Sequence, residues 1–278
     1  MSEDTEGATA RIGEWWQSGI TDFEPGKIWL RGYPVEQLIG RTGFAATTWL
    51  MVRGELPSAG EAKLFEAALV AAVDHGPQAP STAIARMAVS CGAGLNGAMA
   101  SAVNVLDDIH GGAGEQAMEL FADVMARIDA GAAPDDAASL ACAAWRETRG
   151  AFIPGFGHRF HQTDPRAPRL MALVDEAVAA GTVEGRLAAA ARGIESALAA
   201  DKGKPIGMNV DGATAVVYGE LGFAAPLARG LFVLSRSVGA LAHAWEEQCQ
   251  GTRIKSPMPP EMHHLYTGPP PRDLPIEE

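Results

Sequence analysis

The sequence predicts an all-α protein, and three observations support this class. Amphipathic helical stripes with recognisable starts and stops recur along most of the chain, alternating strand patterns are almost absent, and no repeat has a fixed period. Hydrophobic residues make up 47% of the 278 residues and charged residues 20%, a balance that can bury a sizeable core. At roughly 100–200 residues per domain, this length allows one large domain or two smaller ones.

Local signals place the expected elements in chain order. The stretch Lys27–Tyr33 is the best candidate for a small ribbon. Ser58 and Glu61 have the spacing of a capping box, so a helix is expected to begin after Ser58. Asp164–Pro165 suits an N-cap followed by a first-turn proline, and Gly181 suits the end of that helix. Further helices are expected over 80–106, 113–130, 135–149, 185–200 and 211–220.

The longest amphipathic stripe follows Pro226. Its apolar residues share one helix face: Leu227, Leu231, Leu234, Val238, Leu241 and Trp245. Arg229, Arg236 and His243 fall opposite this stripe, on one line at seven-residue spacing. Such a line is usually a solvated polar face, and the sharper alternative is a site that faces a second domain or subunit.

Charge and cysteine content exclude several classes of protein. With 22 Lys and Arg against 34 Asp and Glu, the net charge is −12, which disfavours a nucleic-acid binder but leaves room for one positive pocket. The scattered Cys91, Cys142 and Cys249 predict small buried thiols in a reducing cytoplasm. With no targeting or membrane segment recognised, we expect a cytoplasmic protein. The proline-rich section Ser256–Glu278 predicts an extended arm or a disordered tail.

Two histidines stand among glycines. His110 is followed by Gly-Gly-Ala-Gly-Glu, and His158 is preceded by Pro-Gly-Phe-Gly. Flanking glycines leave an imidazole uncrowded and let the backbone approach a ligand, as proton transfer requires, although a loop histidine that caps a helix is an equally good explanation. His75, in Asp-His-Gly-Pro, has a similar but weaker setting. No carboxylate stands at ligand spacing from His158 and His161, so we expect no metal site.

Asp211 is a further candidate. It stands in Met-Asn-Val-Asp-Gly, after a stretch rich in Lys, Gly and Pro and before an apolar helix. The plain interpretation of such a residue is an ordinary N-cap aspartate.

Taken together, these motifs resemble the citrate synthase superfamily, which includes citryl-CoA lyases and the C-terminal cleavage domain of ATP-citrate lyase. Six motifs carry the likeness in order: DHG at 74–76, HGGxxE at 110–115, GxGHR with DPR within 155–166, NVD at 209–211, SR at 235–236 and RxKS at 253–256. The likeness extends from about residue 28 to residue 269, which is nearly the whole chain.

The resemblance implies an architecture. A large helical domain would comprise residues 1–111 and 208–278, and a small helical domain, residues 112–207, would be inserted in it. The active site would lie between the two domains, and closure of the small domain would exclude water. The resemblance also implies a homodimer in which Arg253 reaches the site of the other subunit.

The resemblance assigns catalysis to His110, His158 and Asp211. In the synthetic direction, Asp211 would remove a proton from the thioester methyl group while His110 hydrogen-bonds the thioester oxygen, and His158 would protonate the ketone. In the cleaving direction, His158 would take the hydroxyl proton and the enol would be protonated through Asp211. No metal or permanently bound cofactor is implied, because the coenzyme A thioester is a substrate or product.

The resemblance also implies binding residues. By the resemblance, the contacts to the di- or tricarboxylate are His75, Arg166, Arg236 and Arg253, and the forked donors of the arginines match carboxylates. The backbone predicted to receive the CoA adenine comprises Ile153, Pro154, Gly155, Phe156 and Gly157. Weaker candidates for the CoA phosphates are Arg159, Lys202 and Lys204.

Two departures from a typical citrate synthase favour the lyase branch. The chain lacks much of the usual N-terminal part and has no ATP-grasp region, and Asp-His-Gly-Pro at 74–77 looks like the lyase motif. We therefore expect a citryl-CoA lyase that cleaves citryl-CoA, or a related 3-hydroxy-3-carboxyacyl-CoA, to acetyl-CoA and oxaloacetate or a related 2-keto acid. Open alternatives are a citrate or 2-methylcitrate synthase, a non-catalytic binding or regulatory relative, and a metal-dependent aldolase.

Overall fold

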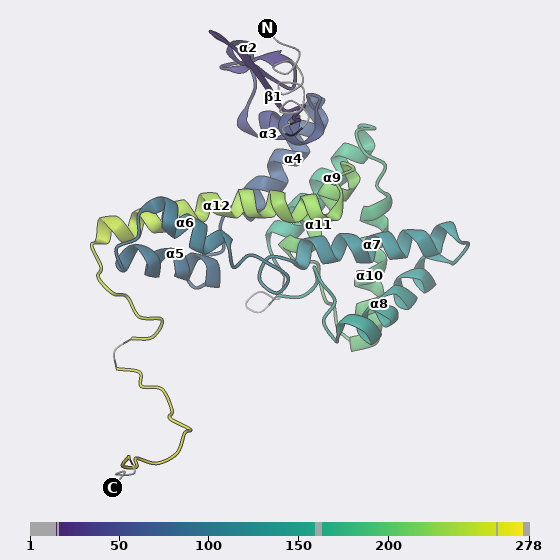
Figure 1. Cartoon of the computed structure of the whole chain (residues 1–278). Helices are drawn as coiled ribbons and strands as arrows, with labels where there is room; N and C mark the ends of the chain where they lie inside the picture. The colour runs from purple at the N-terminus through teal and green to yellow at the C-terminus, as the bar shows by residue number, and fades with distance from the viewer. Residues whose placement is uncertain (1–14, 16, 159–162, 260, 275–278) are drawn as a thin grey trace. The chain divides into compact units, whose positions relative to one another are not determined.

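Helices dominate the structure, a computed structural model that describes residues 15, 17–158, 163–259 and 261–274 (Figure 1). The strands found in these ranges form one small sheet. The predicted all-α class is therefore confirmed. No helix in the described ranges combines the length and apolar character that a bilayer crossing requires.

The small sheet has three antiparallel strands in the order β1-β2-β3: β1 is Thr21–Glu24, β2 is Lys27–Leu30 and β3 is Tyr33–Pro34. The predicted ribbon over 27–33 is confirmed as β2 and the start of β3. Strand β1 was not predicted, because two of its four residues are acidic and only its pairing with β2 makes it a strand; Phe23 lies opposite Ile28.

Eleven helices lie within the described ranges: α2 (Val35–Leu38), α3 (Phe44–Arg53), α4 (Ala59–Ala72), α5 (Pro80–Ser90), α6 (Leu95–Val103), α7 (Ala113–Asp129), α8 (Pro134–Arg149), α9 (Arg166–Ala179), α10 (Arg186–Lys202), α11 (Val210–Glu220) and α12 (Ala225–Gln250). The helices expected near 113–130, 135–149, 185–200 and 211–220 are confirmed. The single helix expected over 80–106 is wrong: α5 and α6 are separated at Gly92, whose φ of 98° strongly favours glycine.

Helix ends confirm two predictions and correct one. Ser58 and Glu61 form the predicted capping box, each accepting the other's backbone N–H. Gly181 follows the end of α9 with φ of 70°, as expected. Asp164, however, is not the N-cap: Pro165 holds that position, and Asp164 stands one residue earlier, accepting the backbone N–H of Arg166 at 3.1 Å.

The chain divides into two compact units. The first comprises the residues up to Asp74 together with Leu106–Val238, and the second comprises His75–Val105 and the residues from Gly239 on. Helix α12, the longest in Figure 1, passes from one unit to the other. This division differs from the large and small domains over 1–111 with 208–278 and over 112–207, which stay a prediction from the resemblance.

The core of the first unit surrounds α11. Almost every residue of this helix is buried, and α4, α7, α9 and α10 pack around it. Aromatic rings close the side facing α4: Phe65 stacks on Phe223 at 5.4 Å between centroids, and Trp49 meets Phe223 edge-on at 4.9 Å. The second unit packs α5 and α6 against the end of α12, and its buried apolar residues are alanines: Ala85, Ala98, Ala102, Ala240 and Ala244.

The predicted burial of the α12 stripe is wrong for its later part. Leu231 is buried, but the last four members of the stripe are exposed: Leu234, Val238, Leu241 and Trp245. The buried line instead contains Ser235 and Arg236, so the solvated polar face expected for Arg236 is also wrong. The physical reason is hydrogen bonding to α4: Ser235 donates to the Leu69 carbonyl, and Arg236 donates to the Ala72 carbonyl at 2.9 Å.

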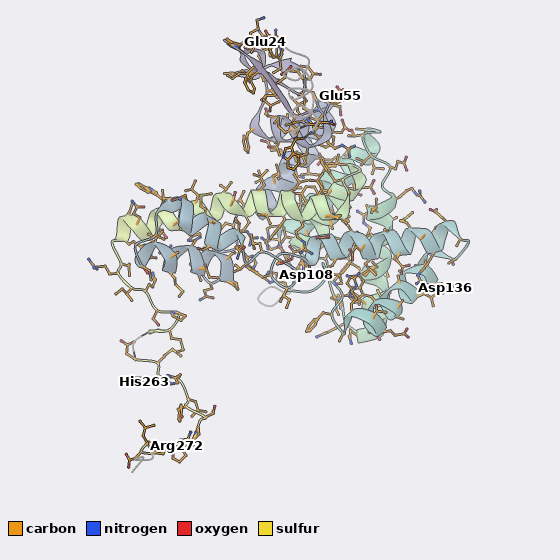
Figure 2. All side chains as sticks on the ribbon, viewed as in Figure 1. Glu24, Glu55, Asp108, Asp136, His263 and Arg272 are labelled. Carbon is orange, nitrogen blue, oxygen red and sulfur yellow. The ribbon has the colours of Figure 1, made fainter. Side chains whose placement is uncertain are left out.

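The C-terminal section and the cysteines agree only in part with the sequence predictions. Residues 256–259 and 261–274 contain neither helix nor strand and run as an extended arm (Figure 2). Cys142 is buried as expected, whereas Cys91 and Cys249 are exposed. Both exposed thiols stand at helix ends, Cys91 directly after α5 and Cys249 in the last turn of α12, where little packs over them.

Candidate functional site

Asp211 stands in the first turn of α11 and does not cap it. The N-cap is Asn209, whose side-chain oxygen accepts the backbone N–H of Asp211 at 2.9 Å and of Gly212 at 3.2 Å. The plain interpretation of Asp211 as an N-cap is therefore wrong, because a neighbouring side chain already meets that need. Its partly buried carboxylate is not committed to the helix terminus.

The loop that leads to His158 is held against the start of α11. The backbone N–H of Asn209 donates to the Gly155 carbonyl at 2.9 Å, and its side-chain amide donates to the Gly157 carbonyl at 2.8 Å. Gly155 has φ of 83°, and a Cβ there would lie 2.7 Å from the Gly212 Cα. The glycine permits this close approach, which anchors partly buried His158 next to α11.

His110 stands in a tight turn immediately before α7. A Cβ on Gly112 would lie 2.6 Å from the Asp108 carbonyl oxygen, so the turn is closed too tightly for a side chain. On the first turn of α7, a Cβ on Gly114 would lie 3.6 Å from the Asp211 carbonyl oxygen. The beginnings of α7 and α11 therefore meet, and the structure brings the segments of His110, His158 and Asp211 into one region of the first unit.

Arg236 supplies buried positive charge to this region. It is 3% exposed, and its guanidinium lies 4.8 Å from the centre of the Phe232 ring. Its positive charge acts on both His110 and Asp211. A buried arginine among titratable groups is a recurrent feature of anion sites.

Arg166 is engaged with Asp164. Its Nε and Nη2 atoms each lie 2.9 Å from a different carboxylate oxygen of Asp164, and that carboxylate also accepts the Val210 N–H at 2.9 Å. Burial alone would raise the pKa of Asp164, but the hydrogen bonds from Arg166 and Val210 lower it to about 2. The pair ties the start of α9 to the start of α11, a role that the motif did not reveal.

The protonation of His110 and Asp211 is shifted in opposite directions. Burial raises the pKa of Asp211, although the charges of Arg236 and Arg166 oppose this effect. Burial and the charge of Arg236 lower the pKa of His110, so its imidazole is neutral at pH 7. A carboxylate with increased basicity and a neutral imidazole donor can together move a proton from carbon and stabilise the enolate that results.

The lysines predicted to contact the CoA phosphates lie on the surface. Lys202 ends α10, is exposed and pairs with Asp201 at 3.6 Å, and Lys204 is exposed in the following loop. Arg159 and His161 lie outside the described residues. Within the described ranges, no group of three His, Cys, Asp or Glu side chains is placed to hold a metal ion.

His75 and Arg253 belong to the second unit. His75 begins that unit, and Arg253 is exposed on the segment after α12. On this segment, the Ile254 and Lys255 backbone N–H groups donate to the carbonyl and the hydroxyl of Ser90, each at 2.9 Å. The residues that follow Arg253 are therefore attached to the end of α5.

A buried carboxylate completes this attachment. The Glu247 side chain is fully buried, and it accepts from Lys255 Nζ at 2.7 and 2.9 Å and from Arg86 Nε at 2.6 Å. Burial alone would raise the pKa of Glu247, but its contacts with Lys255, Thr252 and Arg86 lower it. Glu247 was not predicted, because on a helical wheel a buried glutamate looks like any solvated one.

We predict that Glu247→Gln lowers the free energy of unfolding by about 1–3 kcal/mol, because a buried, doubly paired charge is lost. The matched control is Glu246→Gln, which removes a carboxylate that also contacts Arg86 but is 59% exposed, and should cost less than about 1 kcal/mol. Urea denaturation of both variants measures the difference. Because the pKa of Glu247 is lowered by folding, the effect should be full at neutral pH and disappear as the pH falls through that lowered value. Equal losses for the two variants would contradict the prediction.

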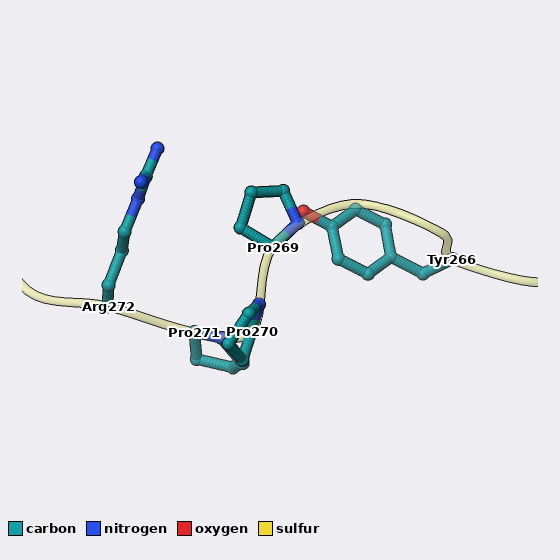
Figure 3. A pocket seen from close by; sticks show the side chains of 5 residues that line it. All are labelled: Tyr266, Pro269, Pro270, Pro271 and Arg272. Atoms are coloured by element: carbon teal, nitrogen blue, oxygen red, sulfur yellow. The ribbon is translucent and has the colours of Figure 1, made fainter.

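Two surface hollows lie away from these residues. One is lined by residues of the extended arm alone (Figure 3): Tyr266, Pro269, Pro270, Pro271 and Arg272. The other lies between α4 and α9 and contains the ion pair of Lys63 and Glu176 at 3.2 Å. Neither contains a residue that the sequence predicted for the site.

Comparison with known proteins identifies the family. The family model described as "Citrate synthase, C-terminal domain" matches residues 57–258. A citrate synthase of Heyndrickxia coagulans is 32% identical over 239 residues, which cover 84% of this chain and 58% of that protein. The chain spans little more than half the length of the curated relatives it matches. The chain belongs to the citrate synthase family, as the motifs predicted.

Solved structures of this family resemble the chain over most of its length. The structure of a citryl-CoA lyase from Hydrogenobacter thermophilus is 34% identical with a TM-score of 0.81, and the match covers 94% of this chain and 97% of that one. An ATP citrate lyase of Methanosaeta concilii, solved in complex with (3S)-citryl-CoA, has a TM-score of 0.75 at 21% identity over 96% of this chain and 45% of that one. At that identity, the second likeness shows the fold alone.

Proposed function

We propose that this protein is a citryl-CoA lyase, which cleaves citryl-CoA or a related 3-hydroxy-3-carboxyacyl-CoA to acetyl-CoA and oxaloacetate or a related 2-keto acid. The observation that carries the proposal is the likeness to the Hydrogenobacter thermophilus lyase, which extends over nearly the full length of both chains. The curated citrate synthases match over only about half of their length.

In the proposed reaction, His158 accepts the proton of the substrate hydroxyl group. The carbon–carbon bond then breaks, its electron pair passes to the thioester as an enolate, and the hydroxyl carbon becomes the ketone of the 2-keto acid. The neutral imidazole of His110 donates a hydrogen bond to the enolate oxygen. A proton delivered through Asp211 completes acetyl-CoA, and the raised pKa of this residue favours that role because it can hold a proton nearer neutral pH.

Carboxylate recognition is proposed for the arginines. Arg236 is buried where its charge reaches His110 and Asp211, which suits a contact to the keto-acid carboxylate. We assign Arg166 and His75 to the same ligand, and Arg253 to the site of a partner subunit in a cytoplasmic homodimer. The backbone of 153–157 would receive the CoA adenine, with Lys202 and Lys204 near its phosphates and no permanently bound cofactor.

The test offers citryl-CoA in one reaction and acetyl-CoA with several 2-keto acids, oxaloacetate included, in another. We expect turnover of citryl-CoA that persists after exhaustive chelation. Rapid thiol release from acetyl-CoA and oxaloacetate, with no turnover of citryl-CoA, would instead support the second candidate, a citrate or 2-methylcitrate synthase, which the curated sequence relatives favour. Binding of CoA without turnover in either direction would indicate a non-catalytic relative.

A further inference from the structure

Arg229 on α12 is surrounded by three carboxylates. Its Nη1 atom lies 2.6 Å from Asp107 and its Nη2 atom 2.5 Å from Asp108, and its Nε atom contacts Glu115. The Arg229 side chain is 22% exposed and that of Glu115 is 13% exposed, so this contact is partly removed from water, whereas Asp107 and Asp108 are 81% and 75% exposed. One guanidinium therefore holds three acidic side chains that would otherwise repel one another.

These carboxylates stand on both sides of His110. Asp107 and Asp108 belong to the turn before it, and Glu115 belongs to the first turn of α7; Figure 2 labels Asp108 on this turn. A second contact between α7 and this turn is a hydrogen bond: the Gln116 side-chain amide donates to the Asp108 carbonyl at 3.0 Å. Arg229 thus joins the two ends of the turn that carries His110.

The same helix holds Arg229 and Arg236, seven residues apart. This spacing is two helical turns, so both side chains lie on one face of α12. At the Arg236 end of this stretch, Ser235 and Arg236 donate to carbonyls of α4, which fixes this part of α12 in the first unit. Helix α12 therefore both anchors the turn of His110, through Arg229, and supplies the charge that acts on His110, through Arg236.

We propose that Arg229 is a positioning residue. It holds the turn 107–112 so that the His110 imidazole keeps its position relative to Arg236 and Asp211. The inference rests on the proposed function, in which His110 hydrogen-bonds the thioester oxygen. Arg229 does not touch the reacting atoms in this assignment. Its importance comes from three contacts that only a planar, forked cation can make at once.

The test compares Arg229→Gln, Arg229→Lys and the control Arg192→Gln. Arg192 is also in the first unit and contacts both oxygens of Asp175 at 2.8 Å, but this pair lies between α9 and α10. We expect kcat to fall by about 10- to 100-fold in both Arg229 variants, since a displacement near 1 Å can cost this much. The control should retain the kcat of the unmodified protein. Unchanged kcat in Arg229→Gln would overturn the proposal.

A second readout separates positioning from charge. Arg236 on α12 acts on His110 through its charge, and the acidic groups that flank His110 in sequence, Asp107 and Asp108 before it and Glu115 on α7, are each paired with Arg229. Loss of the Arg229 cation should raise the pKa of His110, measured by NMR titration of the imidazole, and lysine should restore most of this shift. Low kcat in Arg229→Lys despite a restored pKa supports positioning. Full recovery of kcat with lysine would overturn it and assign the effect to charge alone.

A second variant tests the proposal if Arg229→Gln does not fold, and the unmodified protein tests the proposed function separately. If Arg229→Gln does not fold, Asp108→Asn removes one arm of the cluster and should lower kcat in the same direction; an unchanged kcat there would overturn the proposal. Failure of the proposed function is recognised separately, because the unmodified protein would then turn over neither citryl-CoA nor acetyl-CoA with any keto acid. The Arg229 and Asp108 variants therefore test the proposal once the unmodified protein is shown to be active.

Discussion

Asp211→Asn is expected to lower turnover by about 10³- to 10⁴-fold, because the asparagine amide can neither accept nor deliver the proton exchanged with the thioester methyl group. The substitution preserves the size of the side chain, and Asn209 continues to cap α11. The measurement is kcat for citryl-CoA cleavage at saturating substrate. Turnover close to that of the unmodified protein would refute the role of Asp211.

The stability of Asp211→Asn provides the control for folding. Because folding raises the pKa of Asp211, its contribution to stability is present while it is protonated and is lost as the pH rises through the raised pKa. At pH 7 the asparagine variant should therefore unfold at the same urea concentration as the unmodified protein, or at a higher one. An inactive variant that is also less stable would point to a structural defect.

His158→Ala is the second change with a large expected effect, a loss of about 10²- to 10⁴-fold in kcat, because the hydroxyl proton would lose its acceptor. The matched control is His264→Ala, which truncates an exposed histidine of the extended arm and should leave kcat unchanged. Both variants are assayed for citryl-CoA cleavage and for condensation. A normal rate for His158→Ala in either direction would refute its role as the proton acceptor.

The pH dependence of condensation provides a further test of the role of Asp211. In condensation, Asp211 acts as a base and must be ionised, so the rate should fall on the acid side as the pH drops through its raised pKa. His110 must remain a neutral donor, which its lowered pKa secures at neutral pH. The pH profile of kcat in Asp211→Asn should therefore lack the acid limb assigned to Asp211.

Local signals along the chain predicted much of the fold. The capping box at Ser58 and Glu61 and the glycine stop at Gly181 depend on a few neighbouring residues, so both were read correctly. The long helix over 80–106 was misread because its apolar pattern continues across Gly92, where the backbone turns. Strand β1 and helices α2 and α3 were missed because tertiary pairing and packing decide short elements more than propensity does.

The motifs also predicted which histidines and which aspartate to examine, but not how they are supported. Asn209 relieves Asp211 of capping, Asp164 binds Arg166 and the start of α11, and Arg229 anchors the turn of His110. Each of these contacts joins residues whose importance depends on a partner that the local pattern does not name. Such support becomes visible only when distant segments are placed together.

Helix α12 shows which features the sequence alone predicts and which depend on the tertiary structure. Its length, its start near Pro226 and its family motif at 235–236 follow from the order of residues alone. Its buried face does not, because hydrophobic periodicity assumes that apolar residues turn inward. Here, the Ala72 carbonyl of α4 and the charges of Asp211 and Asp74 favour the burial of charged Arg236, while Trp245 remains 54% exposed. Hydrogen bonding and charge pairing between elements decided that orientation, and with it the electrostatics of the site.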